Sequence, residues 1–366
     1  MKVEFRLKKI LEKERLYRHG VAGEIAKYCK VDRQTIGRIM RNQVRSISLD
    51  LLGKISDWIE KEKGIREPNL PQALLGPQPA QLWEAITQSR RTIICLGQFE
   101  HSGAAEPARY IARCDACVES QIVKFLSQTY PVLLQLETRY VPFRVGPDRD
   151  RLSMTKELAE DTQGAQEIFH SLEEQREQAA VISIGSQITN YVTESAVARL
   201  FGCEPFAPAK PPGSRVPVYV VYRHRDHAVR SCFGGLNPPA GTRGQKRCGI
   251  YYRDGHGDWC PLPWVRDKAD SGIVITVYDP SHSVQPQLLI LGYSGVATET
   301  IGAYVAGDHA NEFWPPVGQS RGMQVGIYLC RIQLEQEQVP STSTVSAGST
   351  VAVIPMDAKV VNKYLR

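Results

Sequence analysis

Short runs of β-branched and aliphatic residues recur through the long central part of the chain, separated by stretches with helical spacing of apolar positions. Strands that alternate with helices favour an α/β architecture, in which helices cover a sheet. We therefore predict a Rossmann-like α/β body over residues 82–337. The predicted strands are Thr92–Leu96, Val181–Ile184, Val216–Tyr222, Ile273–Tyr278, Leu288–Leu291 and Val325–Ile332.

The composition is that of a globular, multidomain protein. Hydrophobic residues make up 42% and charged residues 23% of the 366 residues, so the chain can bury more than one core. Apolar runs such as Leu288–Leu291 are far shorter than the roughly 18 residues that cross a bilayer, and the charged N-terminus lacks the apolar stretch of a signal peptide. The nine cysteines show no disulfide-framework spacing. We expect a cytoplasmic protein with free thiols and no membrane partner.

Shifts in composition divide the chain into four segments. Residues 1–66 are rich in Lys, Arg, Glu, Leu and Ile at helical spacing and predict an all-α headpiece. Residues 67–81 hold four prolines and predict a semi-rigid linker to the α/β body over 82–337. Residues 338–366 begin with a Ser/Thr-rich stretch and predict a tail, with a final short strand over Val351–Pro355.

The positive charge is concentrated in the headpiece. Residues 1–66 carry 17 Lys and Arg against 9 Asp and Glu, whereas the remaining 300 residues carry 28 against 30. A small basic module on a slightly acidic body is typical of a chain in which one part meets a polyanion. A solvated basic face is the alternative that charge alone leaves open.

Residues 23–58 have the spacing of helices that meet across a short turn. Ile25 and Ala26 face a core at the end of one helix, and a tight turn follows at Lys30 and Val31. Asp32 is placed as the N-cap of a second helix. Its apolar positions are Ile36, Ile39 and Met40. A third helix begins after Ser48, ends at Gly64 and buries Leu51, Leu52, Ile55 and Ile59.

With this pattern the chain resembles the phage-repressor-like helix-turn-helix family (lambda- and Cro-type, XRE), which includes many bacterial one-component regulators. The resemblance covers residues 5–64. It implies that Ala26 lets two helices pack closely, that Val31 lies in the turn and that Ile36 anchors the recognition helix. Tyr17–Val21 is longer than the usual connection in this family, which leaves the start of the second helix open.

The resemblance implies an exposed face that reads double-stranded DNA. Arg can form two hydrogen bonds to guanine and Gln two to adenine, while Thr contacts a thymine methyl group or a phosphate. The residues expected to bind DNA are Arg33, Gln34, Thr35, Arg38, Arg41, Asn42, Lys30 and Arg45. The alternative is that these side chains only solvate a helical bundle.

Strand ends with small and hydroxylated residues predict a ligand site in the body. Val181–Asn190 and Leu288–Glu299 each read as strand, Gly/Ser turn and helix, and Ile93–Gly97 with Ser102 and Gly103 is a weaker version. Backbone amides at such turns and helix N-termini favour an anion. Neither a dinucleotide fingerprint nor a P-loop occurs. The expected ligand-binding residues are Gly185, Ser186, Asn190, Glu194, Ser294, Gly295 and Thr298; turns without a ligand are the open alternative.

The sequence gives little support for catalysis or metal binding. Gly292–Val296 departs from the GxSxG pattern at its last position, and Asp308–His309 is too close in sequence to complete a triad. Possible metal ligands are scattered and lack a paired CxxC arrangement. They are Cys114, Cys117, His224, Asp226, His227, Cys232, Cys248, Asp254, His256, Asp258 and Cys260. We assign no catalytic residue, cofactor or metal.

The sequence-based hypothesis is a sequence-specific DNA-binding transcription regulator that forms a homodimer. Its body would sense a small polar or anionic, nucleotide-like ligand, and the linker would transmit the change between two dimer arrangements. One rival is a nucleotide- or ester-processing defence effector that a DNA-binding headpiece tethers. A second rival is an interaction protein whose body only oligomerises.

Overall fold

The computed structural model divides the chain into two compact units, Met1–Gln81 and Leu82–Arg366. The structure describes residues 4–5, 7–13, 16–41, 43–44, 46–63, 75–76, 81–87, 89, 91–101, 108–129, 135–145, 156–175, 179–207, 215–223, 229–242, 247–279, 285–307, 309–314, 318–320, 323–334 and 350–365. Among these residues, no helix combines the length and hydropathy that a membrane crossing requires.

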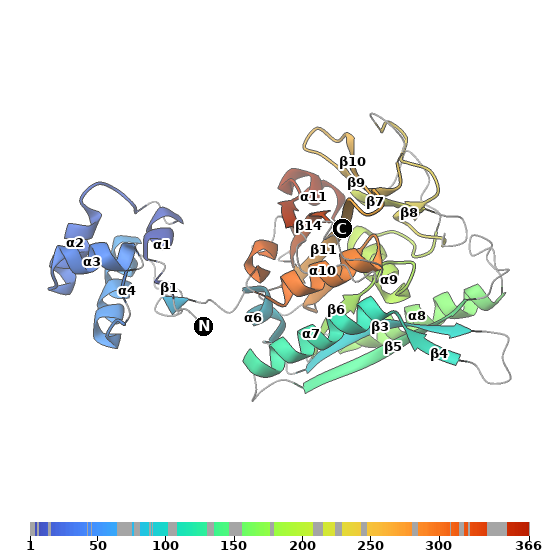
Figure 1. Ribbon diagram of the computed structural model, residues 1–366, viewed down its shortest axis with the longest axis horizontal. Coiled ribbons are helices and arrows are strands. Elements are labelled where there is room, and N and C mark those ends of the chain that lie inside the picture. Colours follow the sequence, from blue (N-terminus) through green and yellow to red (C-terminus); the bar gives the residue numbers. More distant parts are fainter. Residues whose placement is uncertain are drawn as a thin grey trace, which may run out of the picture. The chain divides into compact units, whose positions relative to one another are not determined.

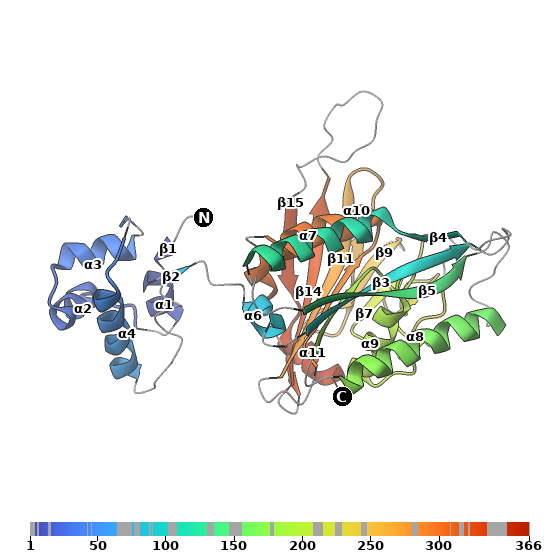
Figure 2. The same cartoon turned by 90° about the horizontal axis from the view of Figure 1, so that it is seen from below.

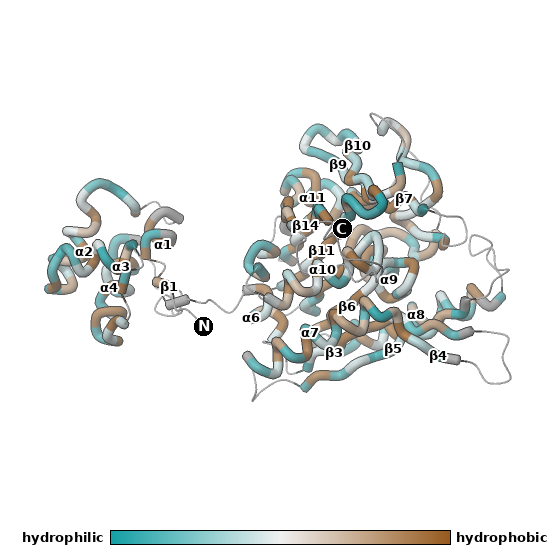
Figure 3. The backbone as a smooth tube through the Cα atoms, viewed as in Figure 1, coloured by the Kyte–Doolittle hydropathy of each residue, from teal (hydrophilic) through white to brown (hydrophobic). Residues whose placement is uncertain are grey.

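The first unit is built on short amphipathic helices that share one core. The helices alternate between hydrophilic and hydrophobic residues, as Figure 3 shows, and the hydrophobic faces bury side chains such as Ile25, Ile36, Trp58 and Ile59. The helices are α1 (Leu7–Lys13), α2 (Val21–Cys29), α3 (Arg33–Met40) and α4 (Leu49–Lys63).

This unit also contains a short antiparallel strand pair. Strand β1 (Glu4–Phe5) pairs with β2 (Leu75–Gly76). The predicted linker therefore contributes a strand to the unit, and the prediction of an all-α headpiece is corrected by this pair. The rest of residues 67–80 lies outside the described residues.

The second unit is an α/β body around a mixed sheet. The described strands of this sheet follow the order β13-β14-β11-β12-β6-β3-β4, with β15 on β14 and β5 on β3 (Figure 1). The strands are β3 (Arg91–His101), β4 (Ala108–Ile111), β5 (Gln135–Val145), β6 (Ala179–Ile184), β11 (Ala269–Tyr278), β12 (Gln287–Gly292), β13 (Gly318–Ser320), β14 (Met323–Gln333) and β15 (Thr350–Pro355).

The centre of this sheet is parallel, because β12, β6, β3 and β5 run in the same direction. Helices cover both faces: α7 and α10 lie on one face, and α8 and α9 on the other (Figure 2). The helices of the body are α6 (Gln81–Thr87), α7 (Arg113–Thr129), α8 (Lys156–Glu174), α9 (Tyr191–Phe201), α10 (Gly295–Val305) and α11 (Ala358–Tyr364), with a 3₁₀ turn η2 at Ala310–Phe313.

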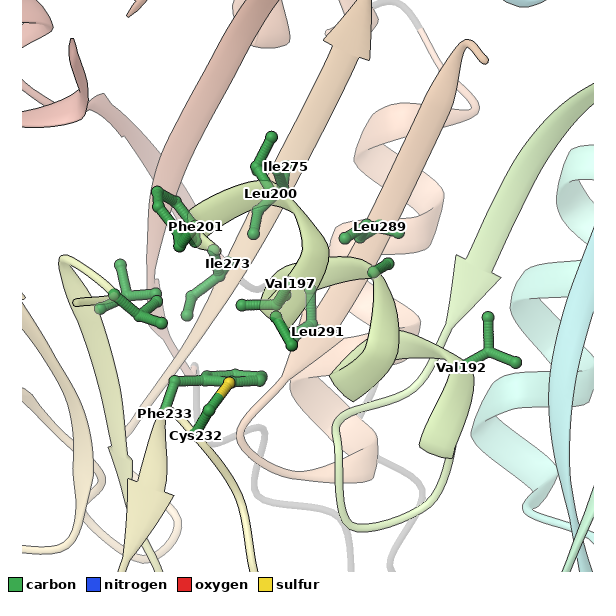
Figure 4. Packing of buried hydrophobic residues seen from close by; sticks show 14 of the residues in the cluster. Val192, Val197, Leu200, Phe201, Cys232, Phe233, Ile273, Ile275, Leu289 and Leu291 are labelled. Carbon is green, nitrogen blue, oxygen red and sulfur yellow. The ribbon is translucent and has the colours of Figure 1, made fainter. Parts of the chain in front are cut away.

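Helix α9 lies in the middle of the larger core. Every residue of α9 except Arg199 is buried, and Figure 4 shows its apolar side chains facing Ile273 and Ile275 of β11 and Leu289 and Leu291 of β12. A helix that is apolar on nearly all sides requires cover on its outer side as well. Residues around Cys232 and Phe233 contribute to that cover.

A smaller sheet, in which four strands are described, carries this outer cover in the order β10-β9-β7-β8. Its strands are β7 (Val218–Val221), β8 (Gly234–Gly235), β9 (Gly249–Arg253) and β10 (Trp259–Pro263). The predicted strand Val216–Tyr222 thus exists as β7, but it belongs to this second sheet rather than to the central one.

The C-terminal part of the chain belongs to the body. The predicted final strand is confirmed as β15, which pairs with β14 from Tyr328 to Gln333, and α11 buries Val360 and Val361 in the larger core. The predicted boundary at residue 337 is therefore too early for the segment from Thr350 onward. The Ser/Thr-rich stretch up to residue 349 lies outside the described residues.

Candidate functional site

The turn and cap before α3 are formed as the sequence predicts. Lys30 adopts the left-handed conformation with φ of 56°, and its N–H donates to the carbonyls of Ala26 and Lys27. The Asp32 side chain accepts a hydrogen bond from the Gln34 N–H at 2.6 Å. A left-handed residue that ends one helix and an Asp that caps the next fix the angle between α2 and α3.

Helix α3 separates an apolar inner face from a basic outer face. Ile36 and Ile39 are buried in the core of the first unit. Arg33, Gln34 and Arg38 are exposed, and Thr35 is half-buried. No acidic residue lies within α3, so its outer face carries positive charge from Arg33 and Arg38 and both donors and acceptors from Gln34 and Thr35.

The remaining residues expected to bind DNA flank this face. Lys30 is exposed in the turn before α3, and Arg41 is exposed directly after the helix. The Arg41 Nε donates to the Gln43 side-chain oxygen at 2.9 Å, which positions the guanidinium near α3. Asn42 and Arg45 lie outside the described residues.

An open basic groove adjoins α3 within the same unit. Its walls come from α1, from the segment before α2 and from α3, and Arg18 in one wall pairs with Glu24 at 2.7 Å. The polar and aromatic side chains along it are Lys8, Tyr17, Arg18, His19, Arg33, Gln34 and Arg41. The sequence did not predict this groove. Its one signal was the unusually long Tyr17–Val21 connection, which lines the groove in the structure. The structure starts α2 at Val21, after Gly20 with φ of 89°.

In the body, the two main predicted loops lie next to each other at the carboxyl edge of the sheet. Strands β6 and β12 are parallel neighbours, and the Gly185 N–H donates to the Ile290 carbonyl at 3.0 Å. Helix α9 leaves β6 toward one face of the sheet, and α10 leaves β12 toward the other (Figure 2). Ligands of open α/β sheets bind where successive connections diverge in this way. We call the residues at this point, Gly185, Ser186, Ser294, Gly295, Cys114 and Asp115, the sheet-edge cluster.

The start of α7 adds two residues to this cluster, Cys114 and Asp115, that the sequence did not single out as ligand-binding. A Cβ atom on Gly185 would lie 3.0 Å from Asp115 Oδ2, and one on Gly295 would lie 2.9 Å from Cys114 Sγ. Asp115 is 2% exposed, and its Oδ2 has no hydrogen-bond partner among the described residues. Burial raises the pKa of Asp115 to about 6, although a hydrogen bond from Cys114 acts in the opposite direction.

Three of the predicted ligand residues instead hold the fold together. The Asn190 amide donates to the carbonyls of Cys95 and Ile184 and to Ser183 Oγ, and its oxygen caps α9 at Val192. The buried Glu194 carboxylate accepts from the N–H groups of Phe206 and Cys232 and from Ser231 Oγ. Burial raises the pKa of Glu194. Thr298 is buried and donates to the Ser294 carbonyl at 3.1 Å.

The other predicted residues belong to the sheet-edge cluster and differ in exposure. Ser186 and Ser294 are half-buried and Gly295 is exposed, while Gly185 is buried with φ of 105°. Ser294 caps α10, and its hydroxyl donates a hydrogen bond to Asp270 Oδ2. Asp270 is the second residue of β11. Burial raises the pKa of Asp270 to about 6, although hydrogen bonds from Ser294 and Ser271 act in the opposite direction. No local motif marks Asp270, because its contact with Ser294 spans two strands.

The weaker third loop differs from its prediction. Strand β3 continues through Gly97 to His101 rather than ending at Leu96. A side chain on Gly97 would overlap the Thr189 carbonyl, so this glycine allows the β6–α9 loop to pack on β3. Ser102 and Gly103 lie outside the described residues.

The geometry offers little for a hydrolytic triad or a metal centre. His309 pairs with Glu312 at 2.7 Å beyond the end of α10 opposite to Ser294, and an 11-residue helix is about 16 Å long. Asp254 organises the β9–β10 turn by accepting from the N–H groups of His256 and Asp258, both at 2.9 Å. Within the described part of the chain, no group of three or more His, Cys, Asp or Glu side chains is arranged to hold a metal ion. His224, Asp226 and His227 lie outside that part.

Comparison of the chain with protein-family models, with curated proteins and with solved structures finds no match.

Proposed function

We propose that the chain is a sequence-specific DNA-binding transcription regulator whose body binds a small polar or anionic ligand. The observation that carries the proposal is the outer face of α3, where Arg33, Gln34 and Arg38 are exposed while Ile36 and Ile39 fix the helix from the other side. Exposed Arg and Gln side chains on one rigid helix supply the donors and acceptors that read base edges in the major groove.

The groove beside α3 supports the same proposal. Lys8, Arg18, His19 and Arg41 lie along it, and phosphate contacts supply most of the sequence-independent affinity for DNA. A homodimer would place two such helices in half-sites about 34 Å apart. The similarity of the first unit to phage-repressor-like proteins remains part of this proposal.

Selection of operator sequences with the full chain, followed by quantitative binding at fixed salt, tests DNA binding. We expect Arg38→Ala and Gln34→Ala to weaken the selected operator about 5- to 150-fold and to relax preference at one base position. Lys30→Ala should instead weaken all sequences alike, because a phosphate contact carries no sequence information.

Lys54→Ala is the matched control, since Lys54 pairs with Asp50 on α4 at 2.6 Å and does not line the groove. This variant also removes one positive charge from the unit. Operator binding by Arg38→Ala that equals binding by Lys54→Ala would contradict recognition through α3.

The proposed ligand site is the sheet-edge cluster. The loops that lead into α9 and α10 lie side by side there, Gly295 at the start of α10 is exposed, and helix N-termini favour negative charge. The Rossmann-like interpretation of the body rests on the same divergence of α9 and α10, although the sheet around the parallel centre is mixed. Ligand would act by binding one dimer arrangement more tightly than the other.

Thermal shift of the full chain with a panel of nucleotides and anionic metabolites tests ligand binding. We expect a ligand that raises the melting temperature to change operator affinity as well, and Ser186→Ala to reduce both effects. A panel without any shift, together with unchanged operator affinity, would remove the sensing half of the proposal and leave DNA binding standing.

One contact supports the rival effector enzyme. The Ser294 hydroxyl donates to the Asp270 carboxylate, which is the arrangement of a hydroxyl nucleophile beside a base. Turnover of a nucleotide or an ester by the wild-type chain, lost in Ser294→Ala, would favour the enzyme. An altered ligand response without turnover would favour the regulator.

A further inference from the structure

Strand β5 forms a long open margin of the central sheet. It has 11 residues, and among the described residues it pairs only with β3, from Gln135 to Val145. Figure 1 shows β5 at the outer border of the body. An edge strand presents unpaired N–H and C=O groups along one side, which is a template for pairing with another strand.

One hydrogen bond shows which peptide groups of β5 point outward. The Arg144 N–H donates to Asp161 Oδ2 of α8 at 2.8 Å rather than to β3. Because backbone groups alternate in direction along a strand, the backbone groups of Leu136, Thr138, Tyr140 and Pro142 also point away from β3.

The outward backbone groups of β5 differ between the two ends of the strand, because those near Arg144 cannot all pair with another strand. Pro142 has no N–H to offer, and the N–H of Arg144 is already bonded to Asp161. Among the described residues, none pairs with the outward donors and acceptors of Leu136, Thr138 and Tyr140. Tyr140 is 45% exposed, which leaves a large aromatic side chain in this stretch of residues 136–140.

The charges on this short stretch fit a second copy of the same strand. If two β5 strands pair in antiparallel fashion around Thr138, Glu137 of each copy lies opposite Arg139 of the other, and Leu136 lies opposite Tyr140. Opposite charges and aromatic–aliphatic pairs stabilise directly opposed positions in a sheet.

The neighbouring registers are unfavourable for the same reason. Pairing centred on residue 137 would oppose Glu137 to itself, and pairing centred on residue 139 would oppose Arg139 to itself. A centre at residue 140 would place Thr138 opposite Pro142, which lacks the required N–H. The register around Thr138 is therefore selected by the side chains and by the backbone together.

We propose that the body forms a homodimer through antiparallel pairing of β5 with β5 of a second copy, centred on Thr138, so that the central sheet continues across the dimer. Glu137 is also bonded to Arg91 and Arg139 of its own chain. The pairing would therefore join these groups into one cluster of alternating charge across the two-fold axis.

This proposal supplies the dimer that the proposed function requires, but it does not depend on DNA binding. Sedimentation equilibrium of the full chain without DNA measures dimerisation alone, so the two proposals can fail separately. A chain that dimerises through β5 but binds no operator would refute the regulator and leave the β5 interface intact.

Charge reversal on β5 tests the pairing and its register. Glu137→Arg and Arg139→Glu should each weaken the dimer at least tenfold, because like charges then face each other twice. A mixture of the two variants should form a heterodimer, in which every opposed pair is again Glu with Arg. The double variant Glu137→Arg/Arg139→Glu should form a homodimer as the wild type does.

Recovery in the mixture excludes misfolding as the cause of monomers, since an unfolded variant could not pair with its complement. Glu173→Arg on α8 is the matched control, because Glu173 pairs with Arg199 at 3.0 Å away from β5, and this variant should remain dimeric. A monomeric wild type, single variants that stay dimeric, or a mixture without heterodimer would each overturn the proposal.

Discussion

Replacing Asp115 by Asn tests a buried carboxylate whose Oδ2 has no hydrogen-bond partner among the described residues. Burial raises the pKa of Asp115 from 3.8 to about 6. The folded chain therefore holds this proton more tightly than the unfolded chain. Protonated Asp115 favours folding at low pH, and that contribution is lost as the pH rises from about 3.8 to about 6. A pKa difference of this size corresponds to about 3 kcal/mol.

The measurement is the free energy of unfolding of the body in the full chain, from urea titrations at several pH values. We expect the stability of Asp115→Asn relative to the wild type to increase by about 3 kcal/mol between pH 3 and pH 7, with most of the change between pH 4 and pH 6. Comparing the variant with the wild type cancels the titration of the other carboxylates.

Asp270→Asn is the matched comparison, because burial raises the pKa of Asp270 to about 6 as well. It should produce a pH dependence of similar size, and the double variant should show both. A stability difference between Asp115→Asn and the wild type that stays constant from pH 3 to pH 7 would refute the electrostatic reasoning.

Two further changes probe the backbone that positions the candidate sites. Asp32→Ala should destabilise α3 by about 1 kcal/mol, since it removes the cap on the Gln34 N–H; faster hydrogen exchange of the α3 amides would reveal this, and unchanged rates would contradict it. Gly97→Ala should abolish the cooperative calorimetric transition of the body, because the methyl group would overlap the Thr189 carbonyl. Gly164→Ala on α8, where a Cβ meets nothing within 4 Å, should instead stabilise the body by about 0.5–1 kcal/mol.

Residue type and spacing within short stretches were sufficient to predict helix caps and buried strands. The cap at Asp32 and the cap at Ser48 were predicted from residue type, and both side chains accept the expected N–H bonds. Runs of β-branched residues predicted the buried strands β6, β11 and β12 because a parallel or central strand is apolar on both faces.

The sequence did not show which distant segments of the chain pack against each other. Nothing in Val216–Tyr222 distinguishes a strand of the small sheet from one of the central sheet, since both are buried. Strand β5 was not predicted from the sequence. Helix α8 covers one of its faces, so the buried residues Val141 and Phe143 alternate with exposed or half-buried residues. Such alternation is a weaker signal than a continuous apolar run.

The same limit applied to the candidate ligand site, and the packing of α7 against α10 explains why. A Cβ on Gly302 would overlap the Val118 side chain, so this glycine lets the two helices approach closely. Val118 lies about one turn after Cys114, and Gly302 lies about two turns after Gly295. Close contact at Val118 and Gly302 therefore brings the beginnings of both helices together, with Cys114 beside Gly295 and Asp115 beside Gly185. The position of the sheet-edge cluster thus depends on a small residue in the middle of a helix, where no motif for anion or nucleotide binding would place it.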